Sequence, residues 1–197
     1  MQTRARLDAQ LAFLTEADRL KSVLRGTTLC DGSRRENSGE HSWHIALYAL
    51  VLRDQAGPGV SIDRVIAMLL IHDLVEIDAG DAPIHGIHDT AAMAIAESAA
   101  AIRIFGLLPP DQATTFRALW EEFEAAQTPD AIFARSLDRV QPVVANLETG
   151  GGTWPAYNVT RAQLETRVGD KVRRGAPALW GALTARLDQW FGAQGHG

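Results

Sequence analysis

Apolar residues recur every three or four positions along almost the whole chain. Leu7, Leu11 and Leu14 set this spacing near the start, and Leu20 and Leu24 continue it. Such spacing is typical of a buried stripe on an amphipathic helix, and no sustained apolar/polar alternation indicates a strand. The sequence therefore predicts an all-α fold, a helical bundle.

Capping residues, glycines and prolines divide the chain into predicted helices. Thr128, followed by Pro129 and Asp130, is the strongest helix start, and Ser61 and Thr160 are further candidate N-caps. One helix is expected to run from near His41 past Leu52, and two more are expected to begin at Ser61 and at Thr160. The remaining helices are expected over 90–105, 111–126, 128–147 and 177–191. Since no linker interrupts 1–197, we expect a single domain, with its motifs in 20–147 and C-terminal helices at 160–193 packing on it.

Charge and composition exclude several classes of protein. The 197 residues are 46% hydrophobic and carry a net charge of −5, which argues against a disordered chain and against binding to duplex nucleic acid. No run of about 18 apolar residues predicts a membrane span. The single cysteine, Cys30, indicates a reducing compartment, so a cytoplasmic protein with a small-molecule ligand is expected.

Ionisable residues interrupt the apolar run at 71–81. His72 and Asp73 can converge on one ion from a helix, and Glu76 shares a face with both. An imidazole and a carboxylate suit a divalent metal, but two ligands cannot close a site. His41 and Asp138, in similarly apolar surroundings, are the candidate partners, and we expect Pro142 to kink the helix beside Asp138.

Three separated motifs carry a family resemblance. They are Arg34-Arg35-Glu36-Asn37-Ser38-Gly39-Glu40-His41-Ser42, then His72-Asp73-Leu74-Val75-Glu76 running to Gly80-Asp81, and Leu137-Asp138. In this order they resemble the HD-domain metal-dependent phosphohydrolases, in particular the branch of small 5′-deoxynucleotidases. The resemblance implies one divalent ion, Mn²⁺, Co²⁺, Fe²⁺, Ni²⁺ or Zn²⁺, held by His41, His72, Asp73 and Asp138.

The same resemblance implies an enzyme that hydrolyses phosphomonoesters, with nucleoside 5′-monophosphates as the expected substrates and a homodimer as the expected assembly. Glu76 would orient or deprotonate the attacking water, and Asp81 would protonate the leaving oxygen or bind a sugar hydroxyl. Arg25 and Arg34 are the candidates for binding the phosphate. Gly26 stands where the branch has a tryptophan, so ribose and deoxyribose both stay open.

Other interpretations stay open at this point. A phosphodiesterase or a nucleotide pyrophosphohydrolase of the same superfamily would fit the motifs, as would a metal-binding regulatory module without activity. His85 and His88 lie in the region from which binuclear relatives take ligands for a second metal. The loop at 149–157, which contains Gly150–Gly152, is interpreted as a flexible connector, and Trp154 in this loop is a candidate for stacking on a base.

Overall fold

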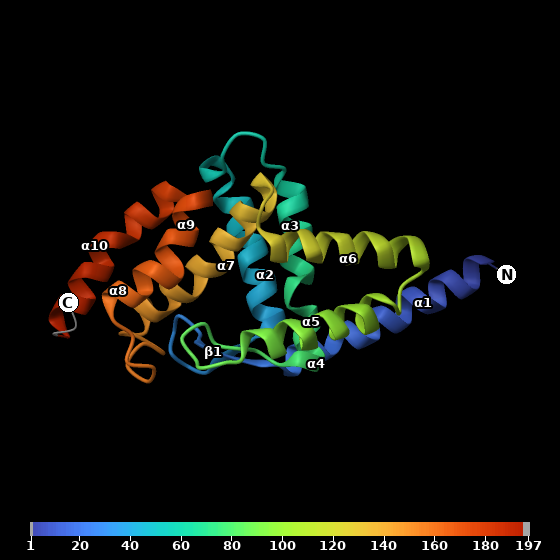
Figure 1. Ribbon diagram of the computed structural model, residues 1–197, viewed down its shortest axis with the longest axis horizontal. Helices are drawn as coiled ribbons and strands as arrows, with labels where there is room; N and C mark the ends of the chain where they lie inside the picture. The colour runs from blue at the N-terminus through green and yellow to red at the C-terminus, as the bar shows by residue number, and fades with distance from the viewer. Residues whose placement is uncertain (1, 195–197) are drawn as a thin grey trace.

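Helices form most of the chain in the computed structural model, which describes residues 2–194 (Figure 1). The α-helices are α1 (Gln2–Ala17), α2 (Ser38–Val51), α3 (Ile62–Ile71), α4 (Glu76–Ala79), α5 (Thr90–Phe105), α6 (Pro110–Ala125), α7 (Pro129–Glu148), α8 (Arg161–Leu164), α9 (Asp170–Gly175) and α10 (Pro177–Ala193). The shorter turns are η1 (Asp18–Ser22), η2 (Arg53–Gln55), η3 (His72–Val75) and the π-helix η4 (Glu165–Gly169). The all-α prediction is confirmed.

Helix α7 lies at the centre of the bundle and contacts α2, α3, α6, α9 and α10. Thr128 accepts a hydrogen bond from the Ala131 amide and Pro129 occupies the first turn, so the predicted helix start is confirmed. The helix continues as one element through Pro142. Because neighbouring helices cover α7 on several sides, most of its faces are buried. The buried residues therefore include polar side chains as well as apolar ones.

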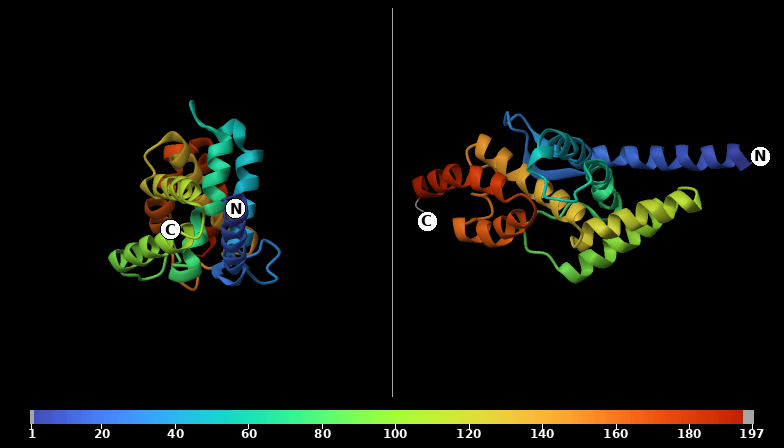
Figure 2. Two further views of the ribbon diagram at one scale, coloured as in Figure 1. Left: turned by 90° about the vertical axis from the view of Figure 1, so that its right-hand side faces the viewer. Right: turned by 90° about the horizontal axis from the view of Figure 1, so that it is seen from above.

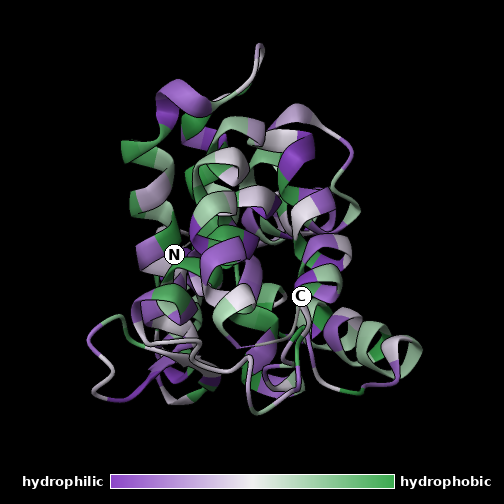
Figure 3. Ribbon diagram, turned by 90° about the vertical axis from the view of Figure 1, so that its left-hand side faces the viewer, coloured by the Kyte–Doolittle hydropathy of each residue, from purple (hydrophilic) through white to green (hydrophobic). Residues whose placement is uncertain are grey.

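Helix α1 projects from the bundle toward one end of the molecule (Figures 1 and 2). The prediction of a buried leucine stripe is wrong here, because Leu7, Leu11 and Leu14 are 53%, 52% and 61% exposed. Phe13, on another face, is the buried residue of this helix and packs edge-on against Phe116 of α6. Spacing alone did not show which face meets the bundle. Hydrophobic and hydrophilic residues alternate along the helices of the molecule in Figure 3.

A two-stranded antiparallel hairpin, β1 (Leu24–Thr28) and β2 (Arg35–Asn37), precedes α2. The hairpin was not predicted from the sequence because its inward residues are polar or charged. Glu36 is 2% exposed and Arg25 is also largely buried, so the strands lack the apolar alternation by which strands are recognised. The hairpin lies beside α7 and brings Arg25 toward the centre of the protein.

The C-terminal helices pack on α7 after a loop at 149–157. Gly150, Gly151 and Gly152 all have positive φ, which a glycine adopts without strain. Trp154 is 1% exposed and contacts Trp190 and Phe191, so its ring is part of the core. Among residues 2–194, no helix is long and apolar enough to cross a membrane.

Candidate metal centre

His41 lies completely buried in the first turn of α2. The helix begins at Ser38, earlier than predicted, because Asn37 and Glu40 form a reciprocal capping box. The His41 Nδ1 lies 2.9 Å from Oε1 of Gln141, an atom that only accepts, so this nitrogen donates. In the neutral ring the Nε2 lone pair is therefore free, and it faces Asp138 Oδ1 at 3.2 Å.

His72 lies where the apolar helix α3 ends and the 3₁₀ turn η3 begins. Its Nδ1 donates to the carbonyl of Leu69 at 2.9 Å, which leaves Nε2 as the free nitrogen of the neutral ring. Nε2 lies 2.8 Å from Asp73 Oδ1 without hydrogen-bond geometry, so among the described residues this buried atom has no hydrogen-bond partner. A buried nitrogen of this kind is expected where a metal binds.

The two histidines and Asp73 offer ligand atoms that all lie within 4.8 Å of one another. Asp138 of α7 joins them, since its Oδ1 lies 3.9 Å from His72 Nε2. The elements α2, η3 and α7, which are far apart in the sequence, thus bring these side chains to one point. Two imidazole nitrogens and two carboxylate groups fit a divalent metal.

Charged neighbours lower the pKa values of the two acids in this cluster. Burial on its own would raise the pKa of Asp73, but His72 and Arg25 outweigh it and lower the pKa to about 2. Burial likewise opposes ionisation of Asp138, yet Arg139 and His41 hold its pKa well below the ordinary value. Both carboxylates are therefore ionised at neutral pH, the form in which they bind a cation.

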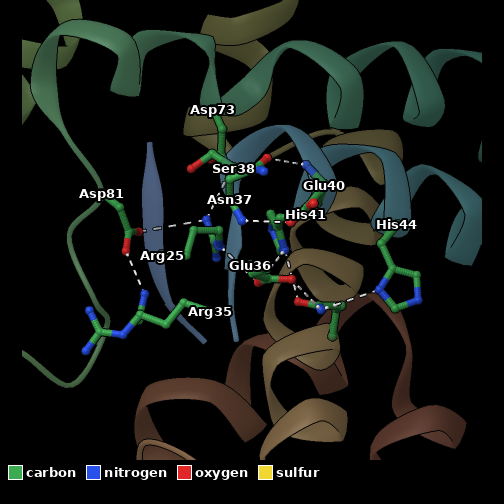
Figure 4. Close-up of polar contacts among 12 residues, drawn as sticks. Arg25, Arg35, Glu36, Asn37, Ser38, Glu40, His41, His44, Asp73 and Asp81 are labelled. Atoms are coloured by element: carbon green, nitrogen blue, oxygen red, sulfur yellow. Dashed lines mark hydrogen bonds and ion pairs between the residues drawn. The ribbon is translucent and has the colours of Figure 1, made fainter. Parts of the chain in front are cut away.

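Arg25 lies among acids on one side of the cluster (Figure 4). Its NH1 is 3.0 Å from Asp73 Oδ2 and its Nε is 3.2 Å from Glu36 Oε1. Asp81 is 3.8 Å away, and it also accepts a bond from the amide of Gly26 at 3.3 Å. Burial disfavours the charge of Arg25, but the surrounding carboxylates raise its pKa above the ordinary value.

Glu76 follows η3 in the short helix α4 and accepts a 2.6 Å hydrogen bond from Ser38 Oγ. Burial, together with the charges of Asp73 and Asp81, raises the pKa of Glu76 to about 9. A divalent cation bound beside it would favour the carboxylate and counteract this shift. Burial also raises the pKa of Asp81.

A cavity of about 270 Å³ opens beside the cluster. Of the predicted site residues it is lined by Arg25, His72, Asp73, Glu76, Asp81 and Asp138, with His41 buried behind them. Arg34 is the exception, because it lies at the surface and forms a bidentate ion pair with Glu40. Of the two candidate second-metal residues, His85 lines the cavity, whereas His88 is exposed and bonds to the carbonyl of Pro83.

Four residues of this site were not predicted from the sequence. Gln141 links His41 to Glu36 through its side-chain amide. Its position three residues after Asp138 places the two on one face of a helix, and this spacing could have indicated that Gln141 belongs to the site. Ser38 and Glu36 stand inside the first motif without having been singled out. Arg139 lines the cavity directly after Asp138.

A family model described as HD domain matches residues 17–180. The chain belongs to the HD domain family. The human 5′-deoxynucleotidase HDDC2 is 31% identical over 136 residues, which cover 68% of this chain and 65% of that protein. The match thus spans less than two thirds of this relative. A 5′-deoxynucleotidase of Photorhabdus laumondii, plu3092, is 24% identical over 81% of the chain and 84% of its own length.

Solved structures show the same fold. A predicted metal-dependent phosphohydrolase from Magnetospirillum magnetotacticum aligns with a TM-score of 0.88 and 50% identity, covering 94% of this chain and 95% of that one. A conserved hypothetical protein from Pyrococcus furiosus aligns with a TM-score of 0.56 at 18% identity, covering 91% and 98%. The second likeness concerns the fold alone.

Proposed function

We propose that this HD-domain protein is a metal-dependent phosphohydrolase that acts on nucleoside 5′-monophosphates. The observation that carries the proposal is the buried Nε2 of His72, which has no hydrogen-bond partner within the described chain and faces the carboxylates of Asp73 and Asp138 beside a cavity. The names of the curated relatives, 5′-deoxynucleotidases, support nucleotides as the substrate class.

We assign the metal to His41, His72, Asp73 and Asp138. A divalent ion bound there would lower the pKa of a water and polarise a phosphoryl oxygen. Gln141 holds the His41 ring in orientation through Nδ1, and the Leu69 carbonyl does the same for His72. These fixed rings place both free nitrogens toward one point.

Glu76 is the proposed acceptor of the proton from the attacking water. Its carboxylate lines the cavity, and Ser38 fixes its orientation by donating to Oε2. Asp81, held by the Gly26 amide, would donate a proton to the leaving oxygen or bind a sugar hydroxyl. Arg25 balances the charge of Asp73 and Glu36 and keeps these acids in place.

The experiment is phosphate release from ribo- and deoxyribonucleoside monophosphates with Mn²⁺, Co²⁺, Fe²⁺, Ni²⁺, Zn²⁺ or Mg²⁺, using Asp73→Ala as the blank. Release that disappears in Asp73→Ala supports the proposal, and the panel also determines the sugar preference and the metal. Bis-esters and triphosphates belong in the same panel. Turnover of these alone would indicate a phosphodiesterase or pyrophosphohydrolase, and metal binding without any turnover would indicate a regulatory module.

We also propose a cytoplasmic location, supported by the single cysteine, Cys30, because a chain with one cysteine cannot form the intramolecular disulfides typical of oxidising compartments. Fractionation of cells that express a tagged chain would test this location. The homodimer stays a prediction from the family resemblance. Light scattering on the purified protein would check it.

A further inference from the structure

A second cavity of about 300 Å³ adjoins the one beside the metal cluster. The two cavities share Gly26, Asp81 and Tyr157 among their lining residues, so they are continuous. Leu24, which is 64% exposed, lines only the second, which we call the outer cavity. The proposed function places the leaving oxygen or a sugar hydroxyl of the substrate at Asp81. The group attached to the far side of that sugar would then lie in the outer cavity.

The walls of the outer cavity suit a flat, uncharged ring. Leu24, Pro83, Ala156 and Tyr157 line it, and the Tyr157 side chain is 39% exposed. An aromatic ring that borders a cavity and is partly open to solvent can receive a second ring face to face. Every nucleobase has such a π face, and stacking on an aromatic side chain is a common way of binding it.

Gly26 keeps space open in the outer cavity. A Cβ at this position would lie 3.6 Å from Pro83 Cγ and 4.0 Å from Thr153 Cγ2, which are ordinary van der Waals contacts. A side chain longer than that of alanine would therefore take up part of the outer cavity. The room that a ring needs beside Tyr157 thus depends on a residue of the hairpin.

Tyr157 is held in place by the core and by α7. Its amide donates to the Thr153 carbonyl at 3.3 Å, and the Thr153 amide donates to Oδ1 of Asn146, a buried residue of α7, at 3.2 Å. Trp154 anchors the same loop in the core, so Tyr157 is the aromatic residue of 149–157 that can contact a ligand. Fixing the loop beforehand lowers the entropy that binding would cost.

We propose that Tyr157 stacks on the base of the substrate nucleotide in the outer cavity and thereby determines specificity. This inference rests on the proposed function and adds the group that selects nucleotides over smaller phosphomonoesters. Because stacking uses a face that all bases share, Tyr157 favours a substrate with a base and discriminates little between bases.

The first test compares phosphomonoesters with and without a base. For nucleoside 5′-monophosphates, Tyr157→Ala should raise KM about tenfold and change kcat less. Ribose 5-phosphate and deoxyribose 5-phosphate carry the same ester without a base, so their KM should stay unchanged in this variant. Tyr157→Phe keeps the ring and should retain the KM of the unmodified protein. Trp43→Ala, which removes a ring that is 63% exposed on α2, is the matched control.

The second test measures binding without turnover. Adenosine has a base and no phosphate, so its calorimetric titration into the metal-loaded protein reports on the outer cavity alone. Tyr157→Ala should raise the Kd for adenosine about tenfold, and Tyr157→Phe should not. Gly26→Leu, which fills the outer cavity from the hairpin, should raise the same Kd.

The results separate this inference from the proposed function. If adenosine does not bind, or binds equally well to the unmodified protein and to a folded Tyr157→Ala, the base site is refuted even where nucleotides are hydrolysed. An equal rise in KM for ribose 5-phosphate would also refute it, because Tyr157 would then act on the part that both substrates share. If no phosphomonoester is turned over and adenosine still binds through Tyr157, the base site stands and the proposed hydrolase activity fails.

Discussion

The two histidines of the cluster are oriented by different kinds of partner. His72 donates to a backbone carbonyl, which mutation of a side chain cannot remove. His41 donates to the side chain of Gln141, which in turn donates to Glu36. The orientation of His41 therefore depends on Gln141, with the Glu36 Oε1 atom 3.5 Å from the same Nδ1, and the contribution of Gln141 can be tested.

Gln141→Leu should weaken metal binding by about 10- to 100-fold, because His41 loses the acceptor that fixes its ring. The measurement is competition with a chelator of known metal affinity. Gln127→Leu, an exposed glutamine just before α7, is the control. An affinity equal to that of the unmodified protein would show that Gln141 does not orient the ligand.

Glu76→Gln should lower kcat by about 10²- to 10⁴-fold, the usual contribution of a general base. The amide retains an oxygen that accepts from Ser38, so metal content and Tm should change little. Steady-state kinetics together with metal analysis provide the readout. Glu121→Gln, whose carboxylate pairs with Arg117 on the surface, should leave kcat unchanged. Full activity in Glu76→Gln would contradict the proposed role.

At the scale of the element, the start of α2 determines where His41 lies. Asn37 accepts from the Glu40 amide, and Glu40 accepts from the Asn37 amide, which places the histidine in the first turn. The spacing of these two residues was a signal in the sequence that the helix begins at Ser38. By contrast, Ser61 at the start of α3 makes no side-chain capping bond within the described residues.

Asn37→Ala should reduce the free energy of unfolding by about 1 kcal/mol through loss of the cap. Ser61→Ala is the matched control, and it should change stability by less than about 0.5 kcal/mol. Urea denaturation of both variants measures the difference. Equal losses in the two variants would mean that the capping box contributes nothing specific.

At the scale of the whole molecule, the metal cluster joins α2, η3 and α7 around several buried acids. A bound divalent ion should therefore stabilise the folded chain as a whole. At a free metal concentration of about 100 times the Kd, the gain is about 2.7 kcal/mol. For a chain of this size that corresponds to an increase in Tm of about 5–10 °C.

Differential scanning calorimetry with and without chelator measures this shift. Asp73→Ala should show little or none of it, since one proposed ligand is gone. A chelator-insensitive Tm in the unmodified protein, with metal analysis confirming removal, would show that the cluster does not hold the ion in the folded state.

The sequence by itself determined the class of fold and the chemistry of the cluster. Helix periodicity, the Thr128 cap and the glycine and proline boundaries are local properties, because propensity and capping act within one or two turns. His72 and Asp73 stood out because ionisable residues in an apolar run are rare without a partner, and the family resemblance implied the full set with His41 and Asp138. The bounds of α5, α6 and α7 were predicted to within one or two residues.

Only the tertiary structure decided which polar groups meet. Arg34 and Arg139 are both arginines beside a motif, yet one pairs with Glu40 at the surface and the other lines the cavity. The leucines of α1 have helical spacing and are still exposed. The hairpin carries Arg25 inward, where acids from distant parts of the chain, Asp73 and Asp81, surround it. Contacts between residues distant in sequence depend on how the elements pack, and local sequence does not encode that packing.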